Sequence, residues 1–305
     1  MTALVETEYA GQHRHRAAQR NVSRASASAG VVLALGGGFS RGFAHLGVLD
    51  VLQQEEIPIS AIVGTSIGAL LGAAYADGIS VQDLCNLGRQ VRVRDFLRFH
   101  PAEPGTPRKD RLGLFVQEWF GATSVQELAI PTAIVTTDLD TAAPYVFTRG
   151  PLELALRASC AFPGLVKPVA YEGRQLADGC ITAPVPTAIA ARMFGGPVLA
   201  VNVGASSGQS SSTVGEGTQQ NFEWPTRFSR DGRPERSWIT CPEIALEPRV
   251  QHLDWNDFSR VDEAFAAGTE AAHQALPGLR ELLAHRSQMA PAMDFTYSVS
   301  EALTR

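Results

Sequence analysis

The stretch from Ala61 to Gly78 constrains the fold of this chain more than any other part of it. It opens with a short apolar run, passes through Gly64-Thr65-Ser66-Ile67-Gly68, and continues as small residues in a helical pattern. Gly-x-Ser-x-Gly between a strand and a helix is typical of a nucleophile elbow, whose glycines permit a turn sharp enough to expose the serine hydroxyl. The N-terminus of the following helix directs its N–H groups at the same place. The stretch therefore predicts a strand, a sharp turn carrying a reactive serine, and a helix.

The same five-residue pattern occurs at two other places, so the pattern alone does not select the serine. Gly38-Phe39-Ser40-Arg41-Gly42 also lies between an apolar run and a helical one. The match around Ser206 leads instead into Gln, Ser, Thr and Gly, so Ser206 is interpreted as a loop residue. Ser40 and Ser66 both remain candidates. The bulky neighbours of Ser40, Phe39 and Arg41, hinder an approaching ester and favour Ser66.

Apolar runs and helical repeats alternate along the chain, which predicts an α/β fold. Strands are expected at Val31–Leu35, Ala61–Val63, Thr132–Thr136, Pro144–Thr148, Val166–Tyr171, Pro197–Val203 and within Ser237–Leu246. Helices are expected at Phe43–Leu52, after Ser66, at Pro151–Ala158, at Pro186–Phe194 and as one or two helices within Phe258–His285. Two consecutive strand–loop–helix units near the start predict a mostly parallel sheet with helices on its faces.

Composition fits one folded domain with flexible ends. The chain has 305 residues, of which 45% are hydrophobic and 19% are charged, enough to bury a sizeable core. We expect a flexible N-terminal tail over 1–29, the folded domain over 30–285 and a C-terminal tail over 286–305. Within the domain, residues 205–220 are rich in Ser, Gly and Gln and are expected to form a mobile loop.

Charge and cysteine content exclude several classes of function. The net charge of -5 argues against nucleic acid as a partner. The four cysteines have no Cys-x-x-Cys spacing, so we expect free thiols in a reducing compartment instead of a disulfide or zinc framework. They are Cys85, Cys160, Cys180 and Cys241.

Any contact with a membrane is expected to be peripheral. The first residues contain no apolar core of the signal-peptide kind, and the longest apolar stretch, Ile67–Ala76, is too short to span a bilayer. Four arginines, Arg89, Arg92, Arg94 and Arg98, alternate with apolar residues. They fit either a basic face for lipid headgroups or an ordinary surface helix. We therefore expect a cytoplasmic protein that contacts membranes, if at all, at their surface.

Three glycines, Gly36-Gly37-Gly38, form the candidate site for negative charge. Glycines let backbone N–H groups turn toward an oxygen without interference from side chains. The loop fits an oxyanion, a phosphate or simply a tight turn, and these alternatives stay open. It is not a Walker A motif, because no Gly-Lys-Ser/Thr follows.

A serine nucleophile also needs a base, and the carboxylates are better placed than the histidines. Asp138 and Asp178 each follow an apolar run, as residues at the C-terminal edge of a parallel sheet do. Asp178-Gly179 is equally typical of a hairpin turn. The downstream histidines do not follow strands, which argues against a histidine base; they are His100, His252, His273 and His285.

Taken in order, these motifs resemble the patatin-like phospholipase family. The matching segments are 36–49, Gly64-Thr65-Ser66-Ile67-Gly68 and Asp178-Gly179, supported by 137–139, 158–164 and 184–186. The sequence is most similar to the bacterial branch, which also resembles the catalytic domain of neuropathy target esterase. The resemblance covers roughly residues 30–285 and implies a three-layer α/β/α domain.

The resemblance also implies a role for each motif residue. Ser66 would be the nucleophile, and Asp178 would be the base that orients it in a Ser-Asp dyad. The N–H groups of Gly37 and Gly38, with Phe39, would form the oxyanion hole. Arg41 would stand beside that loop, in a structural role or in contact with a phosphate.

The sequence departs from the family pattern in two places, the glycine loop and the residues after Asp178. Phe39 stands where a third glycine is usual, so we expect its backbone to avoid conformations that only glycine tolerates. Cys180 follows Asp178-Gly179 in place of Gly or Ala, and Ala183 replaces a frequent Asn. Both departures concern how the site is tuned.

The function implied by the resemblance is that of a lipid acyl hydrolase. Its substrate would be a phospholipid, a lysophospholipid or another fatty-acyl ester, cleaved through an acyl-enzyme without metal or other cofactor. Three alternatives stay open: an acyltransferase with the same acyl-enzyme, a catalytically silent lipid-binding or scaffold module, and a Ser-His-Asp hydrolase.

Overall fold

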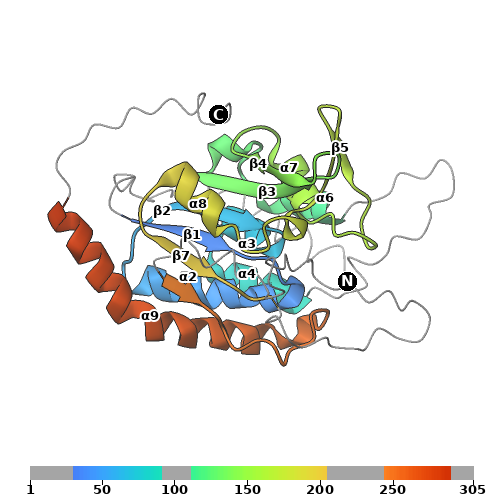
Figure 1. Cartoon of the computed structure of the whole chain (residues 1–305). Helices are drawn as coiled ribbons and strands as arrows, with labels where there is room; N and C mark the ends of the chain where they lie inside the picture. Colours follow the sequence, from blue (N-terminus) through green and yellow to red (C-terminus); the bar gives the residue numbers. More distant parts are fainter. Residues whose placement is uncertain (1–29, 91–110, 205–243, 290–305) are drawn as a thin grey trace, which may run out of the picture.

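The computed structural model describes residues 30–90, 111–204 and 244–289. In these ranges an eight-stranded sheet carries helices on both faces (Figure 1). The strands are β1 Val31–Leu35, β2 Ile59–Thr65, β3 Thr132–Asp138, β4 Ala143–Phe147, β5 Val169–Tyr171, β6 Arg174–Asp178, β7 Val198–Val201 and β8 Ile244–Leu246. The predictions for 1–29, for 205–220 and for all but the first four residues of the expected C-terminal tail 286–305 lie outside the described residues. The same holds for Arg92, Arg94, Arg98, His100, Ser206 and Cys241.

The sheet is mostly parallel, as the sequence predicts. Its order is β5-β6-β3-β2-β1-β7-β8, with β4 also paired to β3. The contacts β3–β2, β2–β1, β1–β7 and β7–β8 are parallel. The contacts of β4, β5 and β6 are antiparallel and form one edge of the sheet. The parallel part needs crossover helices, which accounts for the alternation of strands and helices along the chain.

The helices bury two separate hydrophobic cores against the two faces. They are α2 Ala44–Gln54, α3 Ile67–Ala76, α4 Val81–Gln90, α6 Arg111–Trp119, α7 Leu152–Ser159, α8 Thr187–Phe194 and α9 Val261–Met289. In β1, Leu33 and Leu35 face the larger core, which includes α2, α3, α7 and α9. Val32 and Ala34 face the smaller core, covered by α8. Because successive side chains of a strand point to opposite faces, an apolar run without alternation predicts this burial on both sides.

The long helix α9 crosses α2 at very close range. A Cβ at Gly47 would lie 2.1 Å from the carbonyl oxygen of Phe265, and one at Gly268 would lie 1.9 Å from that of Ala44. Figure 1 shows α9 running beside α2 on the side away from the sheet. The sequence predicts one or two helices within Phe258–His285. The structure has the single α-helix α9 there, which continues through Pro277 to Met289.

Strand β6 is the element that the sequence analysis missed. It pairs antiparallel with β3, and Asp178 stands opposite Thr136. Asp178 therefore does not end a parallel strand, and the reason given for its position was wrong. The antiparallel hairpin of β5 and β6 brings Asp178 from the opposite direction to the level of Thr136. The neighbouring residue Val135 pairs with Thr65 at the end of β2.

Candidate active site

Ser66 lies at a sharp turn between β2 and α3. Its backbone has φ 55° and ψ -123°, a left-handed conformation that costs a non-glycine residue about 1–3 kcal/mol. The flanking glycines are required by close contacts with backbone. A Cβ at Gly64 would lie 2.4 Å from the Cα of Ala69, and one at Gly68 would lie 2.3 Å from the carbonyl oxygen of Leu35. The Gly-x-Ser-x-Gly pattern is thus needed sterically in this fold.

The hydroxyl of Ser66 is paired with the carboxylate of Asp178. Ser66 Oγ donates to Asp178 Oδ2 at 2.7 Å, and Asp178 Oδ1 accepts from the N–H of Cys180 at 2.9 Å. Both side chains are buried. Burial raises the pKa of Asp178 from 3.8 to about 6, opposed by the hydrogen bonds from the Cys180 N–H and from Ser66. The carboxylate therefore accepts a proton more readily than an exposed one would.

Ser159 fixes the backbone at Ser66 through hydrogen bonds, a role that was not predicted from the sequence. The N–H of Ser66 donates to Ser159 Oγ at 2.8 Å, and that hydroxyl donates to the carbonyl of Val135 at 2.7 Å. Ser159 is fully buried at the end of α7. The available signal was its place in segment 158–164, one of the segments that carry the family resemblance.

The glycine loop lies directly against Ser66. A Cβ at Gly37 would lie 3.2 Å from the Cβ of Ser66 and 2.1 Å from Cys180 Sγ, so glycine is needed there for space. The Gly37 N–H already donates to the carbonyl of Pro184 at 3.0 Å. Of the three residues predicted for the oxyanion hole, Gly37 therefore has its donor committed to the fold. The N–H groups of Gly38 and Phe39 have no such backbone acceptor in the described part of the chain.

A buried histidine fixes the start of this loop. His45 Nε2 lies 2.7 Å from the carbonyl oxygen of Gly36 and donates to it, since a carbonyl can only accept. Burial lowers the pKa of His45 from 6.5 to about 4, opposed by that hydrogen bond, so the ring is neutral near pH 7. His45 thus anchors the loop without bringing charge to it.

Phe39 contradicts the expectation for its backbone. It has φ 51°, in the left-handed region that favours glycine. Its ring packs edge-on against Phe162, with centroids 5.1 Å apart, and against Trp255, with centroids 4.9 Å apart. Edge-on aromatic pairs contribute about 0.5–1.5 kcal/mol each beyond area burial, enough to offset the strain.

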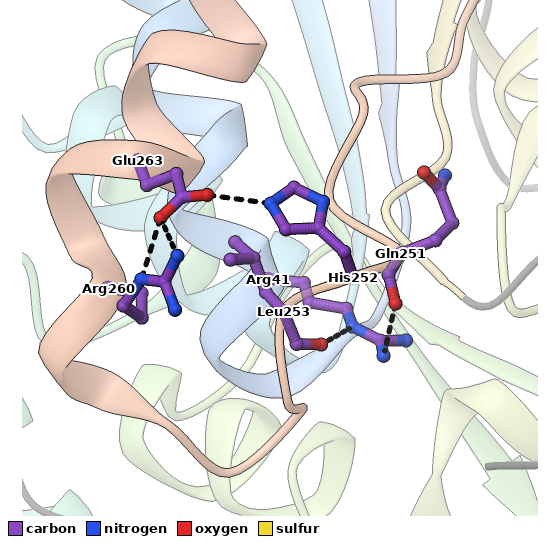
Figure 2. Close-up of polar contacts among 6 residues, drawn as sticks. All are labelled: Arg41, Gln251, His252, Leu253, Arg260 and Glu263. Carbon is purple, nitrogen blue, oxygen red and sulfur yellow. Dashed lines mark hydrogen bonds and ion pairs between the residues drawn. The ribbon is translucent and has the colours of Figure 1, made fainter.

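The other candidate serine, Ser40, and its neighbour Arg41 bind the segment 251–255. Ser40 Oγ lies 2.8 Å from the carbonyl oxygen of Trp255, to which the Ser40 N–H also donates. Arg41 Nε donates to the carbonyl of Leu253 at 2.8 Å, and Nη2 donates to that of Gln251 at 3.2 Å (Figure 2). The buried guanidinium thus contacts main chain, which favours the structural one of its two predicted roles.

The remaining candidate bases are engaged elsewhere. Asp138 is buried in an ion pair with Arg174 at 2.5 Å. His252 pairs with Glu263 at 2.6 Å on the surface, where Glu263 also binds Arg260 (Figure 2). His273 and His285 are exposed on α9. Within the ranges that the structure describes, no histidine is a hydrogen-bond partner of Ser66.

Cys85, Cys160 and Cys180 are free thiols in the structure. Over 30–90, 111–204 and 244–289, no cluster of three or more His, Cys, Asp or Glu side chains is arranged to bind a metal. In the same ranges, no helix has the length and apolar character needed to cross a membrane.

This arrangement can be compared with known proteins. The family model for patatin-like phospholipases matches residues 33–191, more than half of the sequence, and that range includes the glycine loop, Ser66 and Asp178. The chain belongs to the patatin-like phospholipase family. The resemblance found in the sequence is thereby confirmed, together with the α/β fold that it implies.

Relatives of this patatin-like chain come from bacteria and fungi. An uncharacterized NTE family protein of Mycobacterium bovis is 36% identical over 186 residues, which is 60% of this chain and 51% of the relative. Lysophospholipase nte1 of Neurospora crassa is 26% identical over 297 residues, 88% of this chain and 19% of the relative. The chain thus spans about half of the first relative and a smaller part of the second. The solved structure of VipD from Legionella pneumophila has a TM-score of 0.49 at 12% identity over 82% of this chain and 67% of that one, too weak a likeness to bear on function.

Proposed function

We propose that this patatin-like protein is a lipid acyl hydrolase that works through a Ser66–Asp178 dyad. The observation that carries the proposal is the 2.7 Å hydrogen bond from Ser66 Oγ to Asp178 Oδ2 at a strained, glycine-flanked turn. A hydroxyl bonded to a base within about 2.6–3.2 Å is the arrangement of an activated nucleophile. Family membership supports the same assignment.

The proposed reaction has two steps with the same base. In the first, Ser66 Oγ attacks the ester carbonyl, Asp178 takes the hydroxyl proton, and that proton passes to the departing alcohol. In the second, Asp178 takes a proton from water, the hydroxide attacks the acyl-enzyme, and the proton returns to Ser66 Oγ as the fatty acid leaves.

For the oxyanion we propose the N–H groups of Gly38 and Phe39. They follow Gly37 in the loop that lies against Ser66, and the N-terminus of α3 adds its partial positive charge. Gly37 lets the loop approach Ser66 closely, because it has no side chain. His45 and the Gly37–Pro184 hydrogen bond keep the loop in place before substrate arrives.

The proposed substrates are phospholipids, lysophospholipids or other fatty-acyl esters, reached by peripheral contact with a lipid surface. The fungal relatives are named lysophospholipases, which supports this class. No cofactor is part of the proposal, since the dyad supplies both nucleophile and base.

The test is fatty-acid release from lysophosphatidylcholine micelles and phosphatidylcholine vesicles by wild type, Ser66→Ala and Ser40→Ala. We expect Ser66→Ala to lose at least about a thousandfold in kcat, as removal of a nucleophile does. Ser40→Ala should retain turnover, because that hydroxyl bonds to main chain. Loss with Ser40→Ala but not with Ser66→Ala would contradict the proposal. Acyl transfer to added glycerol in preference to water would indicate an acyltransferase, and no turnover by wild type would indicate a silent module.

A further inference from the structure

Three aromatic rings from distant parts of the chain meet beside the proposed dyad. Phe39 comes from the glycine loop, Phe162 from the loop after α7, and Trp255 from the segment before α9. The ring of Phe39 contacts both others, with centroids 5.1 Å and 4.9 Å away. Each of the three residues is partly exposed, so together they offer apolar surface that the fold does not fully cover. We call them the aromatic cluster.

The backbone places the aromatic cluster next to Ser66 and Asp178. Phe39 is two residues from Gly37, which lies against Ser66. Phe162 follows Ala161, whose carbonyl accepts the N–H of Asp178 at 3.0 Å. Two of the three rings are thus carried by segments that also hold the dyad and the proposed oxyanion donors.

The third ring is held in place by a dedicated set of hydrogen bonds. Ser40 donates to the carbonyl of Trp255. The buried Arg41 donates to those of Gln251 and Leu253 (Figure 2). From the other side, Glu263 on α9 binds His252 of the same segment (Figure 2). Trp255 is therefore fixed against the glycine loop although it lies more than two hundred residues further along the chain.

Packing alone does not explain why these rings stay partly exposed. Phe39 adopts a left-handed backbone where a glycine would be free of strain, and its ring packs against those of Phe162 and Trp255. Partly exposed aromatic side chains gathered beside a reactive group are typical of a surface that binds an apolar ligand. The ester substrate of the proposed reaction carries such a group, its hydrocarbon chain.

We propose that Phe39, Phe162 and Trp255 bind the fatty-acyl chain of the substrate and thereby set the preference for chain length. This inference rests on the proposed function. Each methylene that the rings remove from water strengthens binding by about fourfold, so longer chains gain more from the aromatic cluster than short ones do. An acetyl group is too short to benefit.

The test compares kcat/KM for p-nitrophenyl acetate and decanoate in wild type, Trp255→Ala and Phe162→Ala. We expect each substitution to lower the decanoate value by roughly tenfold and to leave the acetate value within about twofold. Tyr171→Ala is the matched control. It removes a partly exposed ring from a separate cluster with Tyr145 and Phe147, at the end of the β5–β6 hairpin opposite Asp178. It should leave both values within about twofold.

The outcomes separate this inference from the proposed function. Equal loss on acetate and decanoate, or no loss on either, would overturn the acyl-chain role while leaving the hydrolase intact. Absence of turnover with both esters in wild type would overturn both proposals. If Trp255→Ala does not fold, Trp255→Phe and Phe162→Ala carry the comparison, and a decanoate-specific decrease in either supports the aromatic cluster.

Discussion

At the scale of single residues, Asp178 is placed where it is costly to ionise and yet needs to be ionised to act as a base. Burial raises its pKa to about 6, while the Cys180 N–H and the Ser66 hydroxyl each donate a hydrogen bond that favours the charge. A base whose pKa lies near the working pH suits general-base catalysis. The same desolvation makes Asp178 a source of instability.

The pH dependence of activity follows from this pKa. We expect kcat/KM to be constant above about pH 7 and to fall tenfold per pH unit well below 6, because protonated Asp178 cannot accept the Ser66 proton. The measurement is a pH–rate profile with a soluble ester. An inflection near 4 would contradict the burial argument. An exposed carboxyl would give an inflection well below that of a histidine. Because the pKa of Asp178 is about 6, close to the ordinary value of histidine, the pH profile alone does not tell an aspartate base from a histidine base. His252→Ala, His273→Ala and His285→Ala must therefore each retain activity.

The stability of the protein should rise when Asp178 is made neutral. Its pKa is raised in the folded state, so the cost of ionisation is absent below about 3.8, grows as the pH rises, and is complete above about 6. At about 1.4 kcal/mol per pKa unit, Asp178→Asn should gain roughly 3 kcal/mol at pH 7.5. Urea unfolding at pH 7.5 and at pH 4 measures this. A gain at pH 7.5 that disappears toward pH 4 is expected, and a loss at pH 7.5 would contradict it.

At the scale of elements, the site depends on short connections held by main-chain hydrogen bonds. The 3₁₀ helix η2, Phe39–Phe43, carries the loop that faces Ser66 and also binds the segment before α9 through Ser40 and Arg41. Loss of these main-chain hydrogen bonds, unlike truncation of the Trp255 ring, should therefore affect the proposed oxyanion hole through η2.

Arg41 tests this connection. Arg41→Met keeps most of the side-chain volume but leaves the carbonyls of Gln251 and Leu253 without their donor, at a cost of about 2 kcal/mol. Arg89→Met is the matched control, because Arg89 also binds the C-terminal region, through Asp262, but in an exposed ion pair. Such pairs contribute little. Urea unfolding should show a clear loss for Arg41→Met and little change for Arg89→Met; equal effects would contradict the assigned role.

At the scale of the whole molecule, α9 packs against α2 and covers the larger core. The segment that contains Trp255 comes just before α9 in the chain. The two helices approach closely enough to exclude a Cβ at Gly47 and at Gly268. Their packing sets where the residues before α9 lie relative to the glycine loop.

Two glycines in α9 give opposite predictions. Gly268→Ala places a Cβ 1.9 Å from the Ala44 carbonyl oxygen, and the shift that this forces should cost about 1–3 kcal/mol. At Gly278 the nearest neighbour of a Cβ is Ile244 Cδ1 at 3.9 Å, so Gly278→Ala should stabilise by up to about 1 kcal/mol through helix propensity. Thermal unfolding of both variants measures the difference, and a Gly268→Ala protein as stable as wild type would contradict the packing.

The sequence predicts the parallel half of the fold well and the antiparallel edge poorly. Strands β1, β2 and β3 each contain an apolar run buried on both faces, which makes them recognisable without their partners. Strand β6 begins with exposed Arg174 and Gln175 and has no clear periodicity, so its existence follows from pairing that no local pattern shows.

The candidate site was likewise predictable only in part from the sequence. Ser66, Asp178 and the glycine loop belong to ordered motifs, and the structure brings them together. Ser159 and Trp255 reach the site from segments far away in the sequence. Segment 158–164 signals Ser159 only through the family resemblance, and Trp255 has no local signature. The positive φ of Phe39 was unforeseen because it depends on rings contributed by two other segments.

The central claim is that Ser66 is a nucleophile activated by Asp178. The most direct test is labelling of purified protein with a fluorophosphonate, followed by peptide mapping, in wild type and in Asp178→Asn. We predict label on Ser66 in wild type and its loss in Asp178→Asn, while unfolding curves show that the variant is folded. Label on Ser40, label on Ser66 that persists undiminished in Asp178→Asn, or no labelled serine at all would contradict the claim.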